Sequence, residues 1–263
     1  MPTIQDEKYL QIIKDAIQVC KSYKPKFGHG KGLTLTEFQI LYQSDPFYAW
    51  FGLDSPSMYA AHKAAGGMTS VYRQIGIGCQ RLFVQLLIDN LGLTTQEATW
   101  FYEVEKIAGK KQNLYLDARI PIANINASRK LAVTNWLQTA CQEIGVAPEI
   151  SQVMKGAVFE VRQGYKSKDS KRQTADIANA AAAYRQGYLP VILLFSTQID
   201  DDVAYRYKKA RWLILNGTLT GLSTNSAYVF CNEVLGYDLA NFFHQYSSEI
   251  KQELGSVLET LLG

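Results

Sequence analysis

The chain lacks the features of several common protein classes. Its longest apolar run, Tyr188 to Phe195, has eight residues, far fewer than the roughly 18 that a membrane-spanning helix needs. The first twenty residues carry acids and lack the apolar centre of a signal peptide. The four cysteines form no C-x-x-C pair and the three histidines form no H-E-x-x-H motif, which excludes the familiar zinc spacings. These absences predict a soluble cytoplasmic protein with no membrane partner.

Charge is also scarce and nearly balanced. The 263 residues include 27 Lys and Arg against 24 Asp and Glu, so the net charge is only +3, and the charged share of 19% lies below the usual value of about 25%. With 47% hydrophobic residues the chain can bury a sizeable core as one large or two modest domains. Because no secretion signal is present, we expect buried structural thiols rather than a disulfide framework.

The first 110 residues are expected to be mainly helical and to pack on a core formed by residues 111–263. Apolar residues at helical spacing predict a helix over 4–22, and residues 24–32 form a basic, glycine-rich loop without the Walker spacing. Thr34 or Thr36 begins a second helix that ends at Asp45-Pro46. The aromatic residues at 47, 48, 50 and 51 are expected in the core, because aromatic side chains bury large areas.

Two further helices are expected before the core. The sequence from Met68 predicts a long helix that ends at Gly92 and contains Gly76 and Gly78, which favour close approach of another backbone or a ligand. Thr94 and Thr95 then cap a helix that we expect to continue to about residue 108.

From residue 113 onward, strand and helix patterns alternate. Strands are predicted at 113–120, 156–163, 189–195 and 211–215, and helices at 128–144, 175–188, 203–210 and over most of the chain after 223. Such alternation predicts an α/β fold in which helices flank a mixed, partly parallel central sheet.

Two acidic residues interrupt apolar strands. Glu160 and Arg162 share one face of the strand at 156–163, and Asp117 interrupts the strand at 113–120. Glu160 can lie on an edge strand facing water or pair with Arg162, and Asp117 can pair with Arg119. Alternatively, the two carboxylates bind Mg²⁺ in a cleft where a cation steadies negative charge, as phosphodiester chemistry requires.

A dense basic run follows directly after Arg162. Its candidate DNA-binding residues are Lys166, Lys168, Lys171, Arg172 and Gln173. A solvated helix start would explain an isolated run of this kind, but because this run follows directly from the strand of Glu160, its charge density favours contact with the phosphates of a polyanion.

These segments resemble a known family. GMTSVYRQIGIGCQRLF, FEVRQGYKSKDSKRQTADIANAAAAY and LPVILLFSTQID resemble type II restriction endonucleases of the PD-(D/E)XK nuclease superfamily, over roughly residues 66–215. The resemblance implies that Asp117 and Glu160 bind Mg²⁺ and that Arg162 takes the position usually held by lysine. Arginine stays protonated and cannot act as a neutral base, so Lys166 or Lys168 is the alternative cation.

Gln80 is a second departure from the family pattern. The resemblance implies a helix-borne glutamate near the metal, and Gln80 occupies a plausible position for it, although an ordinary surface glutamine is the simpler interpretation.

The sequence is consistent with three functions. The first is a Mg²⁺-dependent endonuclease that cuts double-stranded DNA at a short specific sequence and acts as a homodimer without a nucleotide cofactor. The second is a non-catalytic DNA-binding protein that retains the nuclease fold. The third is a small-molecule α/β enzyme, which no glycine fingerprint or nucleophile elbow supports.

Overall fold

A computed structural model describes residues 3–27, 30–105, 111–165 and 170–262. For residues 104–105, 111–112, 114, 170–175 and 177–178 only the backbone is described. The chain divides into two compact units, Met1–Gly78 with Gln245–Gly263 (unit 1) and Cys79–His244 (unit 2). The unit boundary lies at residue 78 rather than at the expected residue 110, because the end of α4 (Pro56–Leu91) and the strand β1 (Trp100–Glu105) belong to unit 2.

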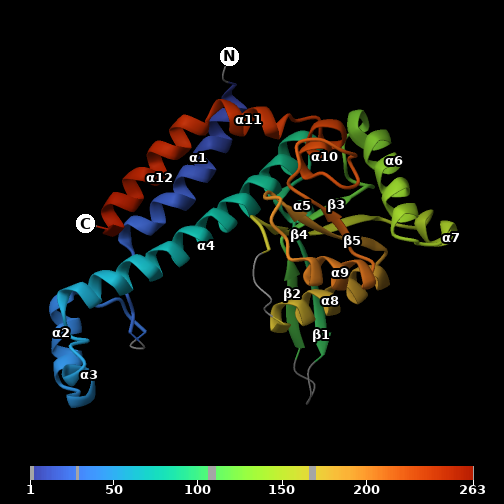
Figure 1. Cartoon of the computed structure of the whole chain (residues 1–263). Coiled ribbons are helices and arrows are strands. Elements are labelled where there is room, and N and C mark those ends of the chain that lie inside the picture. The colour runs from blue at the N-terminus through green and yellow to red at the C-terminus, as the bar shows by residue number, and fades with distance from the viewer. Residues whose placement is uncertain (1–2, 28–29, 106–110, 166–169, 263) are drawn as a thin grey trace. The chain divides into compact units, whose positions relative to one another are not determined.

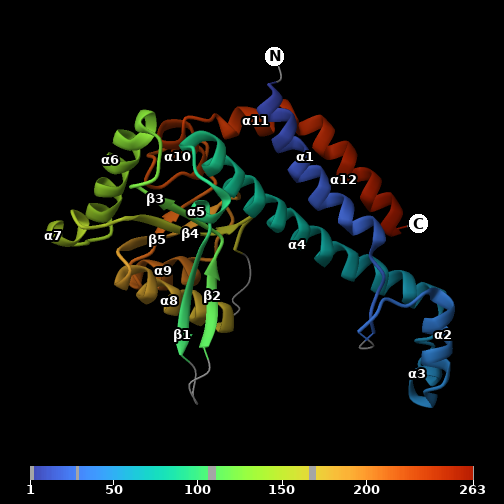
Figure 2. The ribbon, with the colours of Figure 1, turned by 180° about the vertical axis from the view of Figure 1, so that it is seen from behind.

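Unit 1 is helical. It contains α1 (Ile4–Gln18) with the short turn η1 (Val19–Ser22), α2 (Leu35–Gln43), α3 (Pro46–Trp50), the first part of α4 (Pro56–Leu91) and α12 (Ser247–Leu262). Helices α1 and α12 lie side by side (Figures 1 and 2). Lys14 and Lys21 form ion pairs of 3.3 and 3.0 Å with Glu249 and Glu253 of α12.

Helix α4 starts twelve residues earlier than Met68, where the sequence placed it. The Ser55 hydroxyl accepts the backbone N–H of Met58 at 3.3 Å, and Pro56 occupies the first helical position. Gly66 and Gly67 remain helical. A Cβ at Gly66 would lie 1.9 Å from the Tyr23 hydroxyl and one at Gly67 would lie 3.1 Å from Leu261, so these glycines permit close packing inside unit 1.

The expected aromatic core at 47–51 is wrong. Phe47, Trp50 and Phe51 are 58%, 80% and 68% exposed, and Tyr48 is 39% exposed. A five-residue helix can bury only one side, and Tyr48 is the residue that α3 stacks on Tyr42 of α2, with ring centroids 4.9 Å apart.

The helix expected from Thr94 to about residue 108 is also wrong. Thr94 caps only α5 (Thr95–Ala98), which is followed by β1 (Trp100–Glu105). Trp100 and Tyr102 are buried while Phe101 and Glu103 are exposed, which is the two-residue period of a strand. β1 pairs antiparallel with β2 (Lys111–Leu116).

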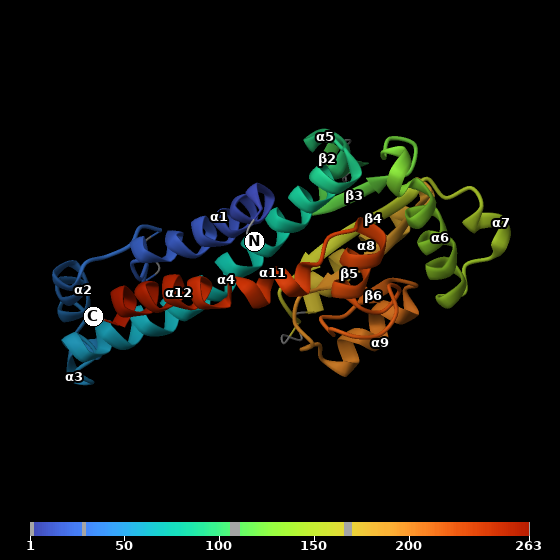
Figure 3. The same cartoon turned by 90° about the horizontal axis from the view of Figure 1, so that it is seen from above.

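Unit 2 is built on a mixed sheet, as expected. Its order is β3 (Ala118–Pro121), β4 (Gly156–Arg162), β5 (Tyr188–Leu194) and β6 (Leu213–Leu215), as Figure 3 shows. β3 is antiparallel to β4, whereas β4, β5 and β6 are parallel. The crossovers are α8 (Ser170–Arg185) and α9 (Asp201–Lys209).

The two faces of this sheet have different partners. Phe159 packs on Phe83 of α4, Trp136 of α6 (Ala127–Glu143) and Phe230 of α10 (Ala227–Phe230), with ring centroids 5.1, 6.3 and 5.9 Å away. On the opposite face, Val158 belongs to a core with α8, α9 and Trp212. Glu160 and Arg162 share the face of Val158 because side chains alternate along a strand.

The remaining elements complete unit 2. They are α7 (Pro148–Ser151), η2 (Cys231–Leu235) and α11 (Leu239–Gln245), which runs to the first residue of the second part of unit 1. All four cysteines are free and buried, as the sequence predicted.

Candidate active site

The pairing of β3 with β4 brings Asp117 close to the end of β4. Asp117 lies at the break between β2 and β3, and the next residue, Ala118, pairs with Phe159 of β4. Asp117 thus precedes the first paired residue of β3 and lies next to the part of β4 that carries Glu160 and Arg162. Although 43 residues separate Asp117 from Glu160 in the sequence, Asp117 is close enough to Arg162 to raise the pKa of its guanidinium.

Asp117 is held by two N–H donors. Its Oδ2 accepts the backbone N–H of Val161 at 2.8 Å and the side-chain amide of Gln80 at 3.2 Å. The same Gln80 amide nitrogen donates to the Val161 carbonyl oxygen at 3.3 Å. Gln80 of α4 is thus fixed beside Asp117 and β4, which contradicts the interpretation of an ordinary surface glutamine.

Glu160 forms a buried ion pair with Arg162. The Nη2 of Arg162 contacts Glu160 Oε1 and lies 3.8 Å from Asp176 Oδ2 of α8. Glu160 is only 7% exposed, and β4 has a neighbouring strand on both sides. The interpretation of Glu160 as an edge-strand residue facing water is therefore wrong, and its pairing with Arg162 is observed.

The guanidinium of Arg162 is kept charged by these acids. Burial on its own lowers the pKa of Arg162, but Glu160, then Asp176 and Asp117, outweigh burial, and the net pKa is raised. This supports the sequence argument that Arg162 cannot serve as a neutral base. Its Nε is buried and has no hydrogen-bond partner among the described atoms.

A network from α8 and α9 supports Arg162, and the sequence did not reveal it. The Tyr207 hydroxyl donates to Asp176 Oδ2 at 2.5 Å, and its oxygen lies 3.2 Å from the Tyr165 hydroxyl, which can donate to it. The Arg162 guanidinium carbon lies 6.0 Å from the centre of the Tyr165 ring. Burial raises the pKa of Tyr207, and the hydrogen bond to Asp176 raises it further. Tyr207 therefore stays protonated and acts as a donor.

A signal for this network was present in ADIANAAAAY. Asp176 and Asn179 are the polar residues of an otherwise alanine-rich stretch and are spaced three apart, so they share one helix face. Both are buried, and the Asn179 side chain accepts the Tyr102 hydroxyl of β1 at 2.5 Å. Buried polar residues on the sheet side of α8 mark the site that α8 covers.

The alternative partner of Asp117, Arg119, is engaged elsewhere. Its Nε donates to the Glu97 carbonyl at 2.8 Å, and its Nη2 donates to the Gln96 carbonyl at 3.0 Å, both in α5. These bonds satisfy the last carbonyls of a four-residue helix.

The basic run is only partly described. Lys166 and Lys168 lie outside the described residues. The first turn of α8 contains Lys171, Arg172 and Gln173, but only their backbone is described. Their contact with DNA stays a prediction, as does the role of Lys166 or Lys168 as the alternative cation.

The donor set around Asp117 suits a hard divalent cation. The described residues contain no group of three or more His, Cys, Asp or Glu side chains arranged to hold a metal ion. Two carboxylates and a backbone carbonyl are nevertheless oxygen ligands, and Mg²⁺ is commonly bound by one or two carboxylates with water and substrate phosphate. The residues present therefore fit Mg²⁺, provided that Glu160 exchanges Arg162 for the metal.

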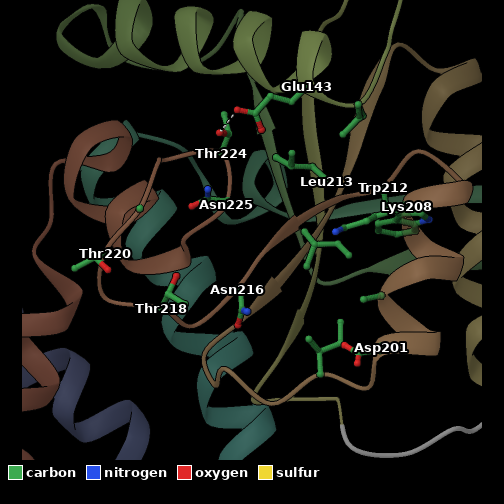
Figure 4. A pocket seen from close by; sticks show the side chains of 15 residues that line it. Glu143, Asp201, Lys208, Trp212, Leu213, Asn216, Thr218, Thr220, Thr224 and Asn225 are labelled. Carbon is green, nitrogen blue, oxygen red and sulfur yellow. Dashed lines mark hydrogen bonds between the residues drawn. The ribbon is translucent and has the colours of Figure 1, made fainter.

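A separate cavity of about 870 Å³ opens at the end of β6 (Figure 4). Lys208 and Asp201 of α9, Asn216 and Thr224 are among its lining residues, and the Thr224 hydroxyl donates to Glu143 at 2.6 Å. Its described lining does not include Asp117, Glu160 or Arg162. The acids among its described lining residues, Glu143 and Asp201, lie on helices α6 and α9. The requirements of a Mg²⁺ site therefore favour the region of Asp117 and Glu160 over this cavity.

No helix in the described parts of the chain is long and apolar enough to cross a membrane. Comparisons of the chain with protein-family models, with curated proteins and with solved structures gave no match.

Proposed function

We propose that this protein is a Mg²⁺-dependent endonuclease that hydrolyses phosphodiester bonds of double-stranded DNA at a short specific sequence. One observation carries the proposal: Asp117 accepts the backbone N–H of Val161, the residue between Glu160 and the buried guanidinium of Arg162, and is held there by the helix-borne amide of Gln80. Two acids and a cation in this arrangement match the needs of phosphoryl chemistry, namely a hard cation site and a positive charge for the phosphate.

Each residue of the candidate site has a role in the proposed reaction. Asp117, Glu160 and the Val161 carbonyl would hold the metal, and Gln80 fixes Asp117 and Val161 in place. Bound Mg²⁺ supplies Lewis-acid polarisation of the phosphoryl group and a water of lowered pKa. Arg162 stabilises negative charge on the phosphate but takes no proton, because it stays charged.

The ion pair between Glu160 and Arg162 has to open for this chemistry. A DNA phosphate would offer the guanidinium a new anionic partner and so leave the Glu160 carboxylate available to hold Mg²⁺. In the overall reaction, the oxygen of one water bonds to phosphorus, the bond to the leaving oxygen breaks, and the leaving oxygen gains a proton.

The second candidate is a DNA-binding protein that has lost catalysis. The buried pairing of Glu160 with Arg162, together with an amide at Gln80 where an acid would add negative charge, favours this alternative. Both candidates place DNA against the basic run, and a two-fold homodimer suits a protein that acts on a palindromic site.

Supercoiled plasmid DNA separates the candidates. Incubation with Mg²⁺ is expected to give discrete linear fragments, with Ca²⁺ as a control that fills an oxygen site without supporting cleavage. A gel shift without cleavage at any Mg²⁺ concentration would favour the second candidate.

Both candidates predict that the basic run contacts DNA phosphates. Lys168→Ala and Arg172→Ala should therefore each reduce the magnitude of the slope of log affinity against log salt concentration by about 0.9. Unchanged slopes would indicate that these residues lie on a solvated surface and do not contact DNA.

A further inference from the structure

The cavity at β6 lies beside an edge strand. It has a volume of about 870 Å³ and is lined by Leu213 and Ile214 of β6, by residues of α6 and α9, and by the loop at 216–225 (Figure 4). β6 is the last strand in the order of the described sheet, and an edge strand offers its backbone N–H and C=O groups to a further strand. We name this space the β6 cavity. Its volume lies within the range of sites that bind drug-sized ligands.

The outer edge of β6 is open at Ile214. Just after β6, Asn216 donates its N–H to the Asn225 carbonyl and accepts the N–H of Ala227, both at 2.8 Å. Because the backbone groups of successive strand residues point to opposite edges, Ile214 directs its N–H and C=O to the same edge as Asn216. In the part of the chain that the structure describes, Ile214 has no backbone hydrogen bond outside the β5–β6 ladder. Ile214 is half-buried and lines the β6 cavity, so a ligand can reach these two groups.

The chain itself covers the outer edge on both sides of Ile214. Ser226 forms a parallel bridge with Asn216, and helix α10 begins at the next residue. On the other side, the Trp212 N–H donates to the Tyr207 carbonyl of α9 at 3.0 Å. The bridge at Asn216 shows that this edge accepts a partner strand, and the opening at Ile214 faces the cavity.

The loop after β6 provides a preorganised rim. The Asn225 side-chain oxygen accepts the Leu222 N–H at 2.9 Å, and the Ser226 hydroxyl donates to the Thr218 carbonyl at 2.5 Å. Leu219 and Leu222 of this loop are 68% and 60% exposed. They offer apolar contact to a bound chain that extends beyond the cavity, and the hydrogen bonds within the loop lower the entropy lost on binding.

We propose that the β6 cavity binds an extended peptide segment of a partner protein, which pairs with the backbone of Ile214. An extended peptide brings N–H and C=O groups at the spacing of a strand edge, and the addition of a strand to a sheet edge is a recurring mode of peptide recognition. The apolar part of the lining, which includes Ile144, Ile199 and Leu213, suits an apolar side chain of that peptide.

Charge favours a peptide that carries a basic residue. The described lining contains two acids, Glu143 and Asp201, and one cation, Lys208. Surplus carboxylate repels the phosphates of a nucleic acid and attracts a lysine or arginine side chain. The inference is independent of the proposed nuclease activity, because the described lining contains no residue of the candidate active site.

Calorimetric titration of the full chain with synthetic peptides tests the proposal. The probes are acetylated pentapeptide amides with lysine at both ends, alanine at the second and fourth positions, and valine, leucine, isoleucine, phenylalanine or tyrosine at the centre. We expect at least one to bind and to slow amide hydrogen exchange at Ile214, measured by NMR. N-methylation of each inner residue in turn should weaken binding about tenfold at the position that donates to the Ile214 carbonyl, because that carbonyl is then left unsatisfied.

Protein variants provide the matched controls. Ile214→Pro removes the outward N–H at an edge position where proline is tolerated, and it should abolish binding. Asp201→Asn should weaken binding about two- to fivefold, as loss of an exposed ion pair does. Asp202→Asn, at the next residue of α9, and Leu131→Glu, at a 73% exposed residue of α6, lie outside the described lining and should bind as the wild type does.

Four results would overturn the inference: no binding of any probe at 1 mM, equal binding of all N-methylated forms, unchanged exchange at Ile214 in the complex, or displacement of the peptide by a short DNA duplex. Circular dichroism checks the fold of each variant. Should Ile214→Pro unfold, the N-methyl series and the exchange measurement on the wild type decide the question, because neither alters the protein.

Discussion

Breaking the pair between Glu160 and Arg162 should destabilise unit 2 measurably. Glu160→Gln removes the charge while keeping the shape of a side chain that is 7% exposed. Loss of one partner from a buried ion pair costs about 3–5 kcal/mol because the other charge is left uncompensated. Here Arg162 keeps Asp176 at 3.8 Å, so we expect about 3 kcal/mol, which lowers the melting temperature by about 6–12 °C for a unit of this size.

A double-mutant cycle isolates the interaction. Arg162→Met leaves Glu160 and Asp176 without the guanidinium, so it should cost at least as much as Glu160→Gln. Because both changes remove the same contact, the double variant should be about 2–3 kcal/mol more stable than the sum of the two single losses predicts.

Tryptophan fluorescence during urea unfolding can report on unit 2 alone. The chain has four tryptophans, and Trp50 is the one in unit 1, so a Trp50→Phe background leaves Trp100, Trp136 and Trp212 as probes of unit 2. Additive losses within about 0.5 kcal/mol would show that Glu160 and Arg162 do not interact, and would contradict the buried ion pair described above.

Three further predictions concern single residues. Gln80→Glu places a carboxylate against Asp117, so its melting temperature should fall without metal and recover in 10 mM Mg²⁺ more than that of the wild type; equal Mg²⁺ responses would contradict the metal site. Hydrogen bonds from the Thr94 backbone and side chain lower the pKa of Glu97. The stability that the charged carboxylate provides is therefore present above the ordinary pKa of glutamate and is lost as the pH falls through the lowered pKa. The difference in unfolding free energy between wild type and Glu97→Gln, measured by urea titration, should vanish in acid. Burial raises the pKa of Cys79 to about 12, and all four thiols are buried, so a disulfide reagent at pH 8 should label none of them until the chain unfolds; rapid native labelling would contradict their burial.

The sheet was predictable because its strands carry strong local signals. The apolar run of β5 is buried almost throughout, and the two acids that interrupt apolar patterns meet at β4, because Glu160 lies on it and Asp117 accepts the N–H of Val161. A charged residue in a buried strand needs a partner, so the sequence alone pointed to this region. It also indicated Arg162 as a partner of Glu160, because residues two apart on a strand share a face.

Other features depend on contacts that local sequence does not encode. The strong cap at Thr94 predicted a long helix, but Trp100 and Tyr102 gain more from burial on β1 than from continuing α5. The α3 aromatics looked like core residues because composition cannot tell whether a short helix has one covered side or two. Asp176 was missed because its importance arises only when α8 folds back over β4.

The most direct test of the proposed function is plasmid cleavage by Asp117→Asn beside the wild type and Leu131→Glu, each checked for folding by circular dichroism. Asp117→Asn keeps an oxygen that can accept the Val161 N–H but removes the charge that would hold Mg²⁺. The account predicts discrete fragments from the wild type and Leu131→Glu with Mg²⁺, and none from Asp117→Asn. Wild-type protein that leaves DNA of varied sequence intact at every Mg²⁺ concentration, or Asp117→Asn that cuts as well as the wild type, would contradict it.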